Sequence, residues 1–282
     1  MAYLHSDREQ FRDAIDLAYE QTGVMVQAIE KDYYVTMLLR LLAQKMPYIV
    51  FKGGTSLSKC HKVIRRFSED IDITIDTLLS QGQKKKIKQA IVDSAQELGM
   101  TIENLDETRS RRDYNRYVIA YDSVIPMASD ALKAAVLLET SYTAVSFPTV
   151  LLPVHSYIGD MMEQEAPDAI EEYNLNPFEM KVQGIDRTLA DKVFAICDYY
   201  LQGKVAKHSR HLYDIYKLLP LVPQDENFRE LVKEVRAVRA QSVICPSALP
   251  EADVPELLEK IIREKAYKQD YDSLTTQLLE EN

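Results

Sequence analysis

The sequence predicts an α+β protein in which a mixed β-sheet core with flanking helices is followed by a helical C-terminal lobe. Up to residue 184, short apolar segments with strand-like character alternate with helical patterns. Beyond that residue, apolar positions recur at three- or four-residue steps and Pro and Gly interrupt them. We therefore expect residues 1–184 to form the sheet core with N-terminal helices and residues 185–282 to form a helical domain.

The N-terminal part is expected to begin with helices. A strong helical period runs from Val24 to Lys45, and Pro47 ends it. The next apolar run, Tyr48 to Phe51, is short enough for a strand, and Gly53-Gly54 breaks it. Because a new helix can start at Ser56, this region predicts a strand, a glycine turn and a helix in succession.

The next strand is predicted by an alternation of isoleucine and polar residues. Ile71, Ile73 and Ile75 are separated by single polar residues, among them Asp72, and Asp70 precedes the first of them. Because side chains alternate between the two faces of a strand, the isoleucines are expected in the core and the aspartates together on the other face.

The remaining elements follow from the same two periods. A helix is predicted over Lys84 to Leu98. Strands are predicted over Arg116 to Tyr121 and Ala134 to Thr140, with a turn at Pro126 between them, and over Phe178 to Val182. Helical patterns in the last hundred residues cover Leu189 to Leu201, Ser209 to Leu219, Asn227 to Ala240 and Val254 to Leu279.

Composition and charge limit the function classes. The 282 residues carry a formal net charge of −10, which argues against a protein that coats nucleic acid through its overall field. Charge is segregated, however: residues 59–116 hold 12 basic and 10 acidic residues, whereas residues 161–180 hold six acids and no base. A local basic face is therefore compatible with the sequence.

Three cysteines at spacings that match no zinc or disulfide pattern are expected to be reduced thiols of a cytoplasmic protein. The histidines show no spacing typical of metal ligands. The N-terminus is too polar for a signal peptide, and no apolar run approaches the roughly 20 residues that span a bilayer. We therefore expect no membrane association.

The paired aspartates predict a divalent-cation site. Asp70 and Asp72, two positions apart on a strand, would present both carboxylates on one face, and transfer of a phosphoryl or nucleotidyl group needs Mg²⁺ held by such carboxylates. Glu139, on a strand expected beside them, is the candidate for a third ligand. Alone, an Asp-x-Asp is commonly a solvated strand face.

The glycine turn predicts a phosphate site. Gly53 and Gly54 let backbone N–H groups approach phosphate oxygens without a Cβ in the way, and Ser56 can add a hydroxyl contact. A Gly-Gly pair alone is usually only a turn. Here the turn and the Asp-x-Asp strand occur within 25 residues, and this combination favours a nucleoside triphosphate bound with Mg²⁺.

A basic and aromatic stretch follows the predicted helix over Lys84 to Leu98. Its side chains are suited to contact RNA, and they suit a solvated hairpin equally well. They are Arg109, Arg111, Arg112 and Arg116 with Tyr114 and Tyr117.

These residues resemble the nucleotidyltransferase superfamily. More narrowly, segment 51–59 (FKGGTSLSK) with segment 66–73 (RFSEDIDI) resembles the AbiEii/AbiGii toxin family of type IV toxin–antitoxin and abortive-infection systems, which includes MenT-like toxins. Segments 29–36, 187–195 and 209–216 extend the resemblance, and the last sixty or so residues lie outside it. The resemblance implies a nucleotidyltransferase-type sheet core.

The resemblance also implies site residues. Lys192 and Asp214 would join Asp70 and Asp72 in the active site, with Lys192 on the polar side of its helix. Residues 30–32 (EKD) resemble a recurrent family segment, and we expect them on a helix that exposes polar residues beside the turn. The nucleotide contacts implied are Lys52, Gly53, Gly54, Thr55, Ser56, Lys59 and Lys192.

The function predicted is a Mg²⁺-dependent toxin that transfers a nucleoside monophosphate from an NTP to an acceptor and releases pyrophosphate. The resemblance suggests tRNA as the acceptor and a cognate antitoxin protein as the partner. Two alternatives stay open. One is a transferase or phosphotransferase that acts on a protein or a small molecule, and the other is a non-catalytic module that binds a nucleotide or a partner.

Overall fold

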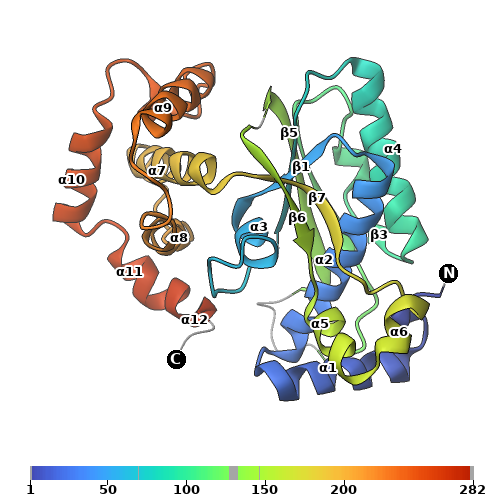
Figure 1. Ribbon diagram of the computed structural model, residues 1–282. Helices are drawn as coiled ribbons and strands as arrows, with labels where there is room; N and C mark the ends of the chain where they lie inside the picture. Colours follow the sequence, from blue (N-terminus) through green and yellow to red (C-terminus); the bar gives the residue numbers. More distant parts are fainter. Residues whose placement is uncertain (1, 69, 127–132, 146, 280–282) are drawn as a thin grey trace. The chain divides into compact units, whose positions relative to one another are not determined.

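The computed structural model describes residues 2–68, 70–126, 133–145 and 147–279. The chain forms two compact units (Figure 1). The sheet unit comprises Met1–Cys60 and Ser68–Val182, and the helical unit comprises His61–Phe67 and Gln183–Asn282. The division after Val182 lies close to the boundary expected at residue 184, whereas the transfer of seven residues from the N-terminal half to the helical unit has no counterpart in the sequence prediction.

The sheet unit has a seven-stranded mixed sheet in the order β3-β4-β5-β2-β1-β7-β6. Strand β1 pairs antiparallel with β2 and parallel with β7, and β2 pairs parallel with β5. The strands are β1 Ile49–Lys52, β2 Asp70–Ile75, β3 Thr101–Ile102, β4 Tyr114–Ala120, β5 Ala135–Val145, β6 Thr149–Val154 and β7 Phe178–Gln183. This arrangement confirms the predicted mixed sheet.

Helices pack against this sheet (Figure 1). Helix α2 contacts α1, α4 and α5, and the short α3 contacts β1 and β2. The core is formed by apolar side chains of α1, α2, α4 and the inner sheet face, where Phe51, Ile71, Ile73 and Leu138 are buried. The helices are α1 Arg8–Thr22, α2 Val26–Lys45, α3 Gly53–Lys59, α4 Gln81–Glu97, α5 Tyr157–Glu165 and α6 Pro167–Glu172.

The helical unit is arranged around α7, which contacts α8, α9 and α10. Apolar side chains on several sides of α7, including Phe194, Ile196 and Cys197, are buried against these helices. The segment His61–Phe67 joins the unit through an isolated β-bridge between Arg66 and Leu279. The helices are α7 Ile185–Leu201, α8 Arg210–Leu218, α9 Glu226–Arg239, α10 Val254–Glu264, α11 Lys268–Asp270 and α12 Thr276–Leu278, with a π-helical turn over Tyr271–Thr275.

Several predictions of local structure need correction. The helix expected from Ser56 begins at Gly53, and the helix expected over 254–279 ends at Glu264, where Lys265 adopts a left-handed φ of 52°. Strands β3 and β6 and helices α5 and α6 have no counterpart in the sequence prediction. The turn expected at Pro126 is not assessed, because the following residues 127–132 lie outside the described residues. In the described part of the chain, no helix is long and apolar enough to cross a membrane.

Candidate active site

Four charged residues form one row across four neighbouring strands of the sheet unit. Lys52 of β1 pairs in register with Asp72 of β2, Asp72 with Glu139 of β5, and Glu139 with Arg116 of β4. The row lies on the face opposite the core, because Ile71, Ile73 and their register partners fill the inner face. Two carboxylates therefore lie side by side, with a basic residue at each end of the row.

Asp70 lies on the same face as Asp72, two positions earlier on β2. Both side chains are partly exposed, whereas Ile71 between them is fully buried. Asp70 pairs in register with Leu137, so Asp72 is the one of the two that has Glu139 as its direct neighbour. The strand assignment thus gives the paired carboxylates that the alternation predicts.

The turn after β1 brings Gly53 into contact with Asp72. A Cβ added to Gly53 would lie 2.0 Å from Oδ2 of Asp72 and 2.9 Å from its Cγ. In addition, Gly53 has a φ of +81°, which side chains other than glycine rarely adopt. Glycine is required here on both counts, and the Asp72 carboxylate occupies the space that its missing side chain leaves.

The hydroxyl groups of the turn are already engaged within the protein. Ser56 is fully buried, and its Oγ donates to the Gly53 carbonyl oxygen at 2.9 Å. Thr55 Oγ1 donates to Ser68 Oγ at 3.0 Å. Phosphate oxygens that approach this turn would therefore meet backbone N–H groups rather than these hydroxyl protons.

Lys59 is paired away from the row of charged residues. Its ammonium forms an ion pair with Asp32 of α2, with both side chains largely buried, and Asp32 also accepts a hydrogen bond from the Tyr157 backbone N–H at 3.1 Å. Glu30 and Lys31 are buried too, so the expectation that residues 30–32 occupy an exposed helix face is wrong. Since Lys59 holds α3 against α2, we leave it out of the proposed nucleotide site.

Glu139 interacts with two residues of β4. Arg116 Nε lies 3.8 Å from Glu139 Oε1, and the Tyr114 hydroxyl group donates a hydrogen bond to the carboxylate. Burial, and then the charge of Glu139 and its hydrogen bond, raise the pKa of Tyr114. Tyr114 therefore stays protonated at neutral pH as a donor to Glu139, a role that the sequence analysis did not assign.

The donor set fits a hard divalent cation. Asp70, Asp72 and Glu139 supply the carboxylate oxygens that Mg²⁺ prefers, and they come from adjacent strands on one face. Among the described residues, no three His, Cys, Asp or Glu side chains already converge on a common point. Binding by Glu139 would require its carboxylate to turn from Arg116 and Tyr114, whereas the two aspartates share β2 and its exposed face.

Lys192 and Asp214 meet in the helical unit. Lys192 Nζ of α7 lies 2.6 Å from Asp214 Oδ2 of α8. Arg66 binds the same carboxylate with a fork: Nε donates to Oδ1 and Nη2 to Oδ2, each at 2.7 Å. Side-chain exposure is 0% for Asp214, 2% for Arg66 and 8% for Lys192, so the expectation that Lys192 lies on the polar side of its helix is wrong.

The charges of this cluster set its protonation. Burial alone would raise the pKa of Asp214, but the nearby Lys192 and Arg66 outweigh it and hold the pKa well below its usual range. Burial, opposed by Asp214 and reinforced by Arg66 and Arg210, lowers the pKa of Lys192. Asp214 is therefore a buried carboxylate, and Arg66 is a site residue that the sequence analysis missed.

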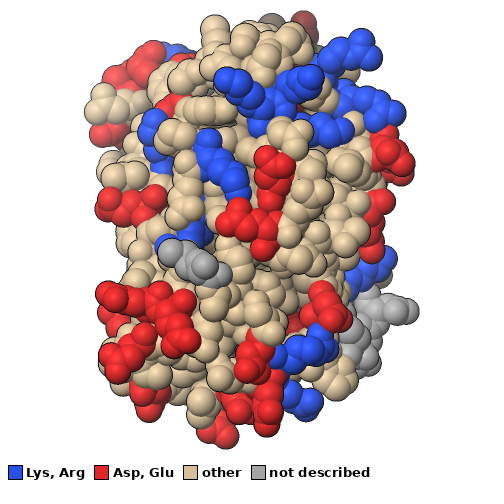
Figure 2. Space-filling view, turned by 90° about the vertical axis from the view of Figure 1, so that its right-hand side faces the viewer, with Lys and Arg blue, Asp and Glu red and all other residues tan. Residues whose placement is uncertain are grey.

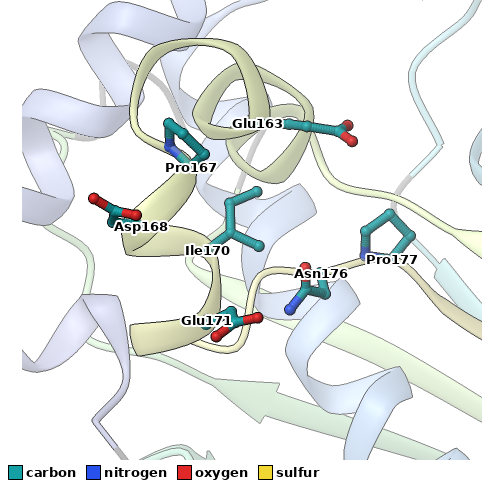
Figure 3. Close-up of a pocket in the computed structure, with 7 residues that line it drawn as sticks. All are labelled: Glu163, Pro167, Asp168, Ile170, Glu171, Asn176 and Pro177. Atoms are coloured by element: carbon teal, nitrogen blue, oxygen red, sulfur yellow. The ribbon is translucent and has the colours of Figure 1, made fainter.

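A separate cavity of about 410 Å³ lies beside α5 and α6 (Figure 3). It contains three carboxylates and no basic residue, which makes it unsuited to a triphosphate. The residues that line it are Glu163, Pro167, Asp168, Ile170, Glu171, Asn176 and Pro177. None of the predicted site residues is among them, so this cavity is not the candidate site.

Comparison of this chain with known protein families finds a match. The model of the family described as "Nucleotidyl transferase AbiEii toxin, Type IV TA system" matches residues 36–282. The match reaches the end of the chain, so the expectation that the last sixty residues lie outside the family is wrong. A search of curated proteins found no match.

Among solved structures, the chain is similar to MenT4, a nucleotidyltransferase toxin from Mycobacterium tuberculosis H37Rv. The two share 17% sequence identity with a TM-score of 0.49, over 80% of this chain and 70% of MenT4. The family match alone spans most of the chain and includes every residue of the row of charged residues, the glycine turn and the Lys192 cluster. The chain belongs to the AbiEii nucleotidyltransferase toxin family of type IV toxin–antitoxin systems.

Proposed function

We propose that this chain transfers a nucleoside monophosphate from an NTP to an acceptor hydroxyl group with Mg²⁺ held by Asp70 and Asp72. The observation that carries this proposal is the close approach of Asp72 to Gly53: a Cβ on Gly53 would overlap the Asp72 carboxylate, so the carboxylate strand lies beside the glycine turn. A metal-bound triphosphate needs both a carboxylate pair and a turn whose backbone is accessible, and the two are adjacent here.

In the proposed reaction, the acceptor oxygen forms a bond to the α-phosphorus. The bond between that phosphorus and the oxygen bridging to the β-phosphate breaks, pyrophosphate leaves, and the hydroxyl proton is released to solvent. Bound Mg²⁺ supplies positive charge that favours the deprotonated acceptor and neutralises the triphosphate. The backbone of Gly53 and Gly54 and the ammonium of Lys52 orient the phosphates, and Glu139 is the proposed third carboxylate.

Lys192 is also proposed to contact the triphosphate, as the family resemblance implies. The buried cluster contains one carboxylate, Asp214, and two cations, Lys192 and Arg66, and so carries a net positive charge. Burial of excess positive charge is unfavourable unless an anion compensates it, and a triphosphate would do so. Asp214 belongs to this proposal as the residue that holds Lys192, because its own carboxylate is inaccessible to substrate.

RNA is the proposed acceptor because a basic surface lies on the sheet unit near α4, and tRNA is proposed among RNAs because the family resemblance suggests it. Figure 2 shows Lys and Arg gathered in the upper part of one face, whereas acidic residues predominate in its lower part and are also scattered over the rest. Lys88 Nζ donates to the Thr108 carbonyl oxygen at 3.0 Å, and Lys84 pairs with Asp113, so the first turns of α4 lie beside the loop after β3. The exposed basic residues there are Lys85, Lys86, Arg109, Arg111 and Arg112.

The position of these lysines argues for an anionic partner. The first turn of α4 contains no acidic residue, and three lysines, Lys84 to Lys86, follow at its N-terminal end. Because they lie beyond the first turn, the helix dipole has little effect on them, and the cost of this placement for the free protein is the repulsion among neighbouring cations, which include Lys88 one turn after Lys84. Contacts with the phosphates of an RNA backbone would offset that cost.

One labelling experiment tests base and acceptor together. The purified protein is incubated with total cell extract, Mg²⁺ and each of the four α-³²P-labelled triphosphates in turn, and RNA, protein and small molecules are then separated. Label in RNA supports the proposal, and label in protein or small molecules would move the acceptor to that class. Triphosphate binding without incorporation would instead identify a non-catalytic module.

The biological role is tested by growth. We propose that the protein acts in the cytoplasm as a toxin that a cognate antitoxin controls, as family membership suggests. Induced expression of the wild type should slow growth, and co-expression of the neighbouring gene should restore it. Equal growth of cells that express the wild type and Asp72→Asn would contradict the toxin role.

A further inference from the structure

A deeply buried ion pair of the helical unit joins two segments that are remote in sequence. Arg66 and Asp214 are 148 positions apart, and both charged groups are almost fully excluded from solvent. The fork of Arg66 uses both oxygens of Asp214, and its third nitrogen, Nη1, donates to the Phe67 carbonyl oxygen at 3.0 Å. All three nitrogens of this guanidinium are thus engaged, so its orientation is fixed.

The backbone around Arg66 is held in the same way. Phe67 N donates to the Leu278 carbonyl oxygen at 2.8 Å, and Arg65 N donates to the Tyr213 hydroxyl group at 3.1 Å. Tyr213 directly precedes Asp214 on α8. The segment His61–Phe67 is therefore fastened to the helical unit by side-chain and backbone contacts on both sides of Arg66.

These contacts of Arg66 and its neighbours lie just before the chain returns to the sheet unit. The helical unit's inserted segment ends at Phe67, and the sheet unit resumes at Ser68, two residues before β2 begins at Asp70. Arg66 is only four positions before Asp70, so this anchored segment directly precedes, along the chain, the strand that carries both aspartates.

We propose that Arg66 is a positioning residue: by holding Asp214 in a bidentate fork, it fixes the ammonium of Lys192 and anchors the chain that leads into the Asp70–Asp72 strand. The planar guanidinium is suited to this task because it holds both carboxylate oxygens, which leaves Oδ2 oriented toward Lys192. Arg66 also stands close enough to Lys192 to lower its pKa. Only the expected effect of Arg66 on turnover rests on the proposed function.

Two substitutions distinguish the effect of the bidentate contact with Asp214 from the effect of the positive charge of Arg66. Arg66→Lys keeps a cation but loses the bidentate geometry, and Arg66→Met loses both. The matched control is Arg239→Met, which removes another arginine of the helical unit whose Nη2 lies 2.7 Å from Asp198. The nucleotide-transfer rate, its KM for NTP and its pH profile are measured for each variant, together with thermal stability.

We expect Arg66→Lys to lower kcat by about tenfold or more. The alkaline limb of the pH–rate profile of this variant should lie near that of the wild type. Arg66→Met should lower kcat further and move the alkaline limb to higher pH, because Lys192 loses a repelling neighbour. Arg239→Met should lower the melting temperature with kcat and pH profile unchanged. If the folded fractions of both Arg66 variants turn over like Arg239→Met, the positioning role is wrong.

A second readout does not depend on activity. The lysines are labelled by reductive ¹³C-methylation, the signal of Lys192 is assigned with Lys192→Arg, and its titration is followed by NMR. The pKa should be higher in Arg66→Met than in the wild type, and it should be the same in Arg239→Met and the wild type. An unchanged titration in Arg66→Met would overturn the inference even if no acceptor is ever labelled, whereas a shifted titration with no nucleotide transfer would remove only the proposed function.

Discussion

The carboxylate of Asp72 lies where a side chain of residue 53 would be: a Cβ on Gly53 would come within 2.0 Å of Oδ2. This contact links two motifs that are 19 positions apart in the chain. It explains why a glycine must follow β1 directly, and it places the strand that is proposed to bind the metal beside the backbone that is proposed to receive phosphates.

Gly53→Ala should therefore be far more damaging than an ordinary glycine substitution. The added Cβ strains a backbone with a φ of +81° and displaces the Asp72 carboxylate, so we expect a loss of roughly 1–3 kcal/mol in stability and a decrease of about 100-fold or more in nucleotide transfer. Urea unfolding and initial rates measure the two effects.

The chain offers a matched control for this substitution. Gly23 has a similar φ of +69°, but a Cβ there would have no atom within 4 Å. Gly23→Ala should cost only the backbone strain, about 1–2 kcal/mol, and leave the transfer rate of the folded protein unchanged. Equal rates for the two variants would show that the Asp72 contact is irrelevant to turnover.

Glu139→Gln tests the proposed third carboxylate. This substitution replaces a carboxylate of the row of charged residues by a neutral amide. It should raise the Mg²⁺ concentration needed for half-maximal transfer by roughly tenfold. Arg116→Met should have the opposite effect, because Arg116 competes for the Glu139 carboxylate. A Mg²⁺ titration that is identical for all three proteins would exclude Glu139 from the metal site.

The buried cluster predicts a specific dependence of stability on pH. Because the pKa of Asp214 in the folded protein lies below the unfolded value of about 3.9, its ionised form stabilises the fold above that pH. The contribution is lost as the pH falls from about 4 toward the folded pKa, since the unfolded chain takes up the proton first. Urea unfolding between pH 7 and pH 2 should show this loss.

Asp214→Asn provides the comparison. It leaves Arg66 and Lys192 without their carboxylate, so the protein should be about 3–5 kcal/mol less stable at pH 7. Its stability should also fall less steeply than that of the wild type below pH 4. Parallel curves for the two proteins would mean that Asp214 does not contribute through its charge.

The sheet unit shows which features could be predicted from sequence. The alternation of Ile71 and Ile73 with aspartates fixes one buried face, so the strand and its carboxylate face follow from the period of two. The strand β6 carries exposed Val150 and Leu151 and contains Pro153, so it lacks the alternation that identifies a strand. The contact of Gly53 with Asp72 depends on strand pairing, which no local pattern specifies.

The helical unit shows which features could not be predicted from local sequence. The apolar period of α7 placed Lys192 on a polar face, but α8, α9 and α10 surround that helix, and a buried ion cluster accommodates the lysine. Arg66 could not be identified, because the partner that makes its burial favourable is 148 positions away. A signal was nevertheless present: Arg66 belongs to the same segment as the Asp-x-Asp motif on which the family resemblance rests.

Charge reversal on the basic surface should weaken transfer to RNA. The double substitution Lys85→Glu and Arg111→Glu removes exposed cations from α4 and the adjacent loop. We expect the KM for RNA to rise about tenfold or more and its salt dependence to become shallower, with the KM for NTP unchanged. Arg263→Glu, an exposed substitution on α10, is the control, and an equal effect from it would contradict a docking role for this surface.

The central claim is that Asp72, held against Gly53, binds the metal that makes nucleotide transfer occur. The most direct measurement is the incorporation of an α-³²P-labelled triphosphate into cell RNA by the wild type and by Asp72→Asn, with and without Mg²⁺, after circular dichroism has shown both proteins to be folded. We expect Mg²⁺-dependent label with the wild type and at least a 1,000-fold decrease with Asp72→Asn. Equal incorporation by the two folded proteins would contradict the account.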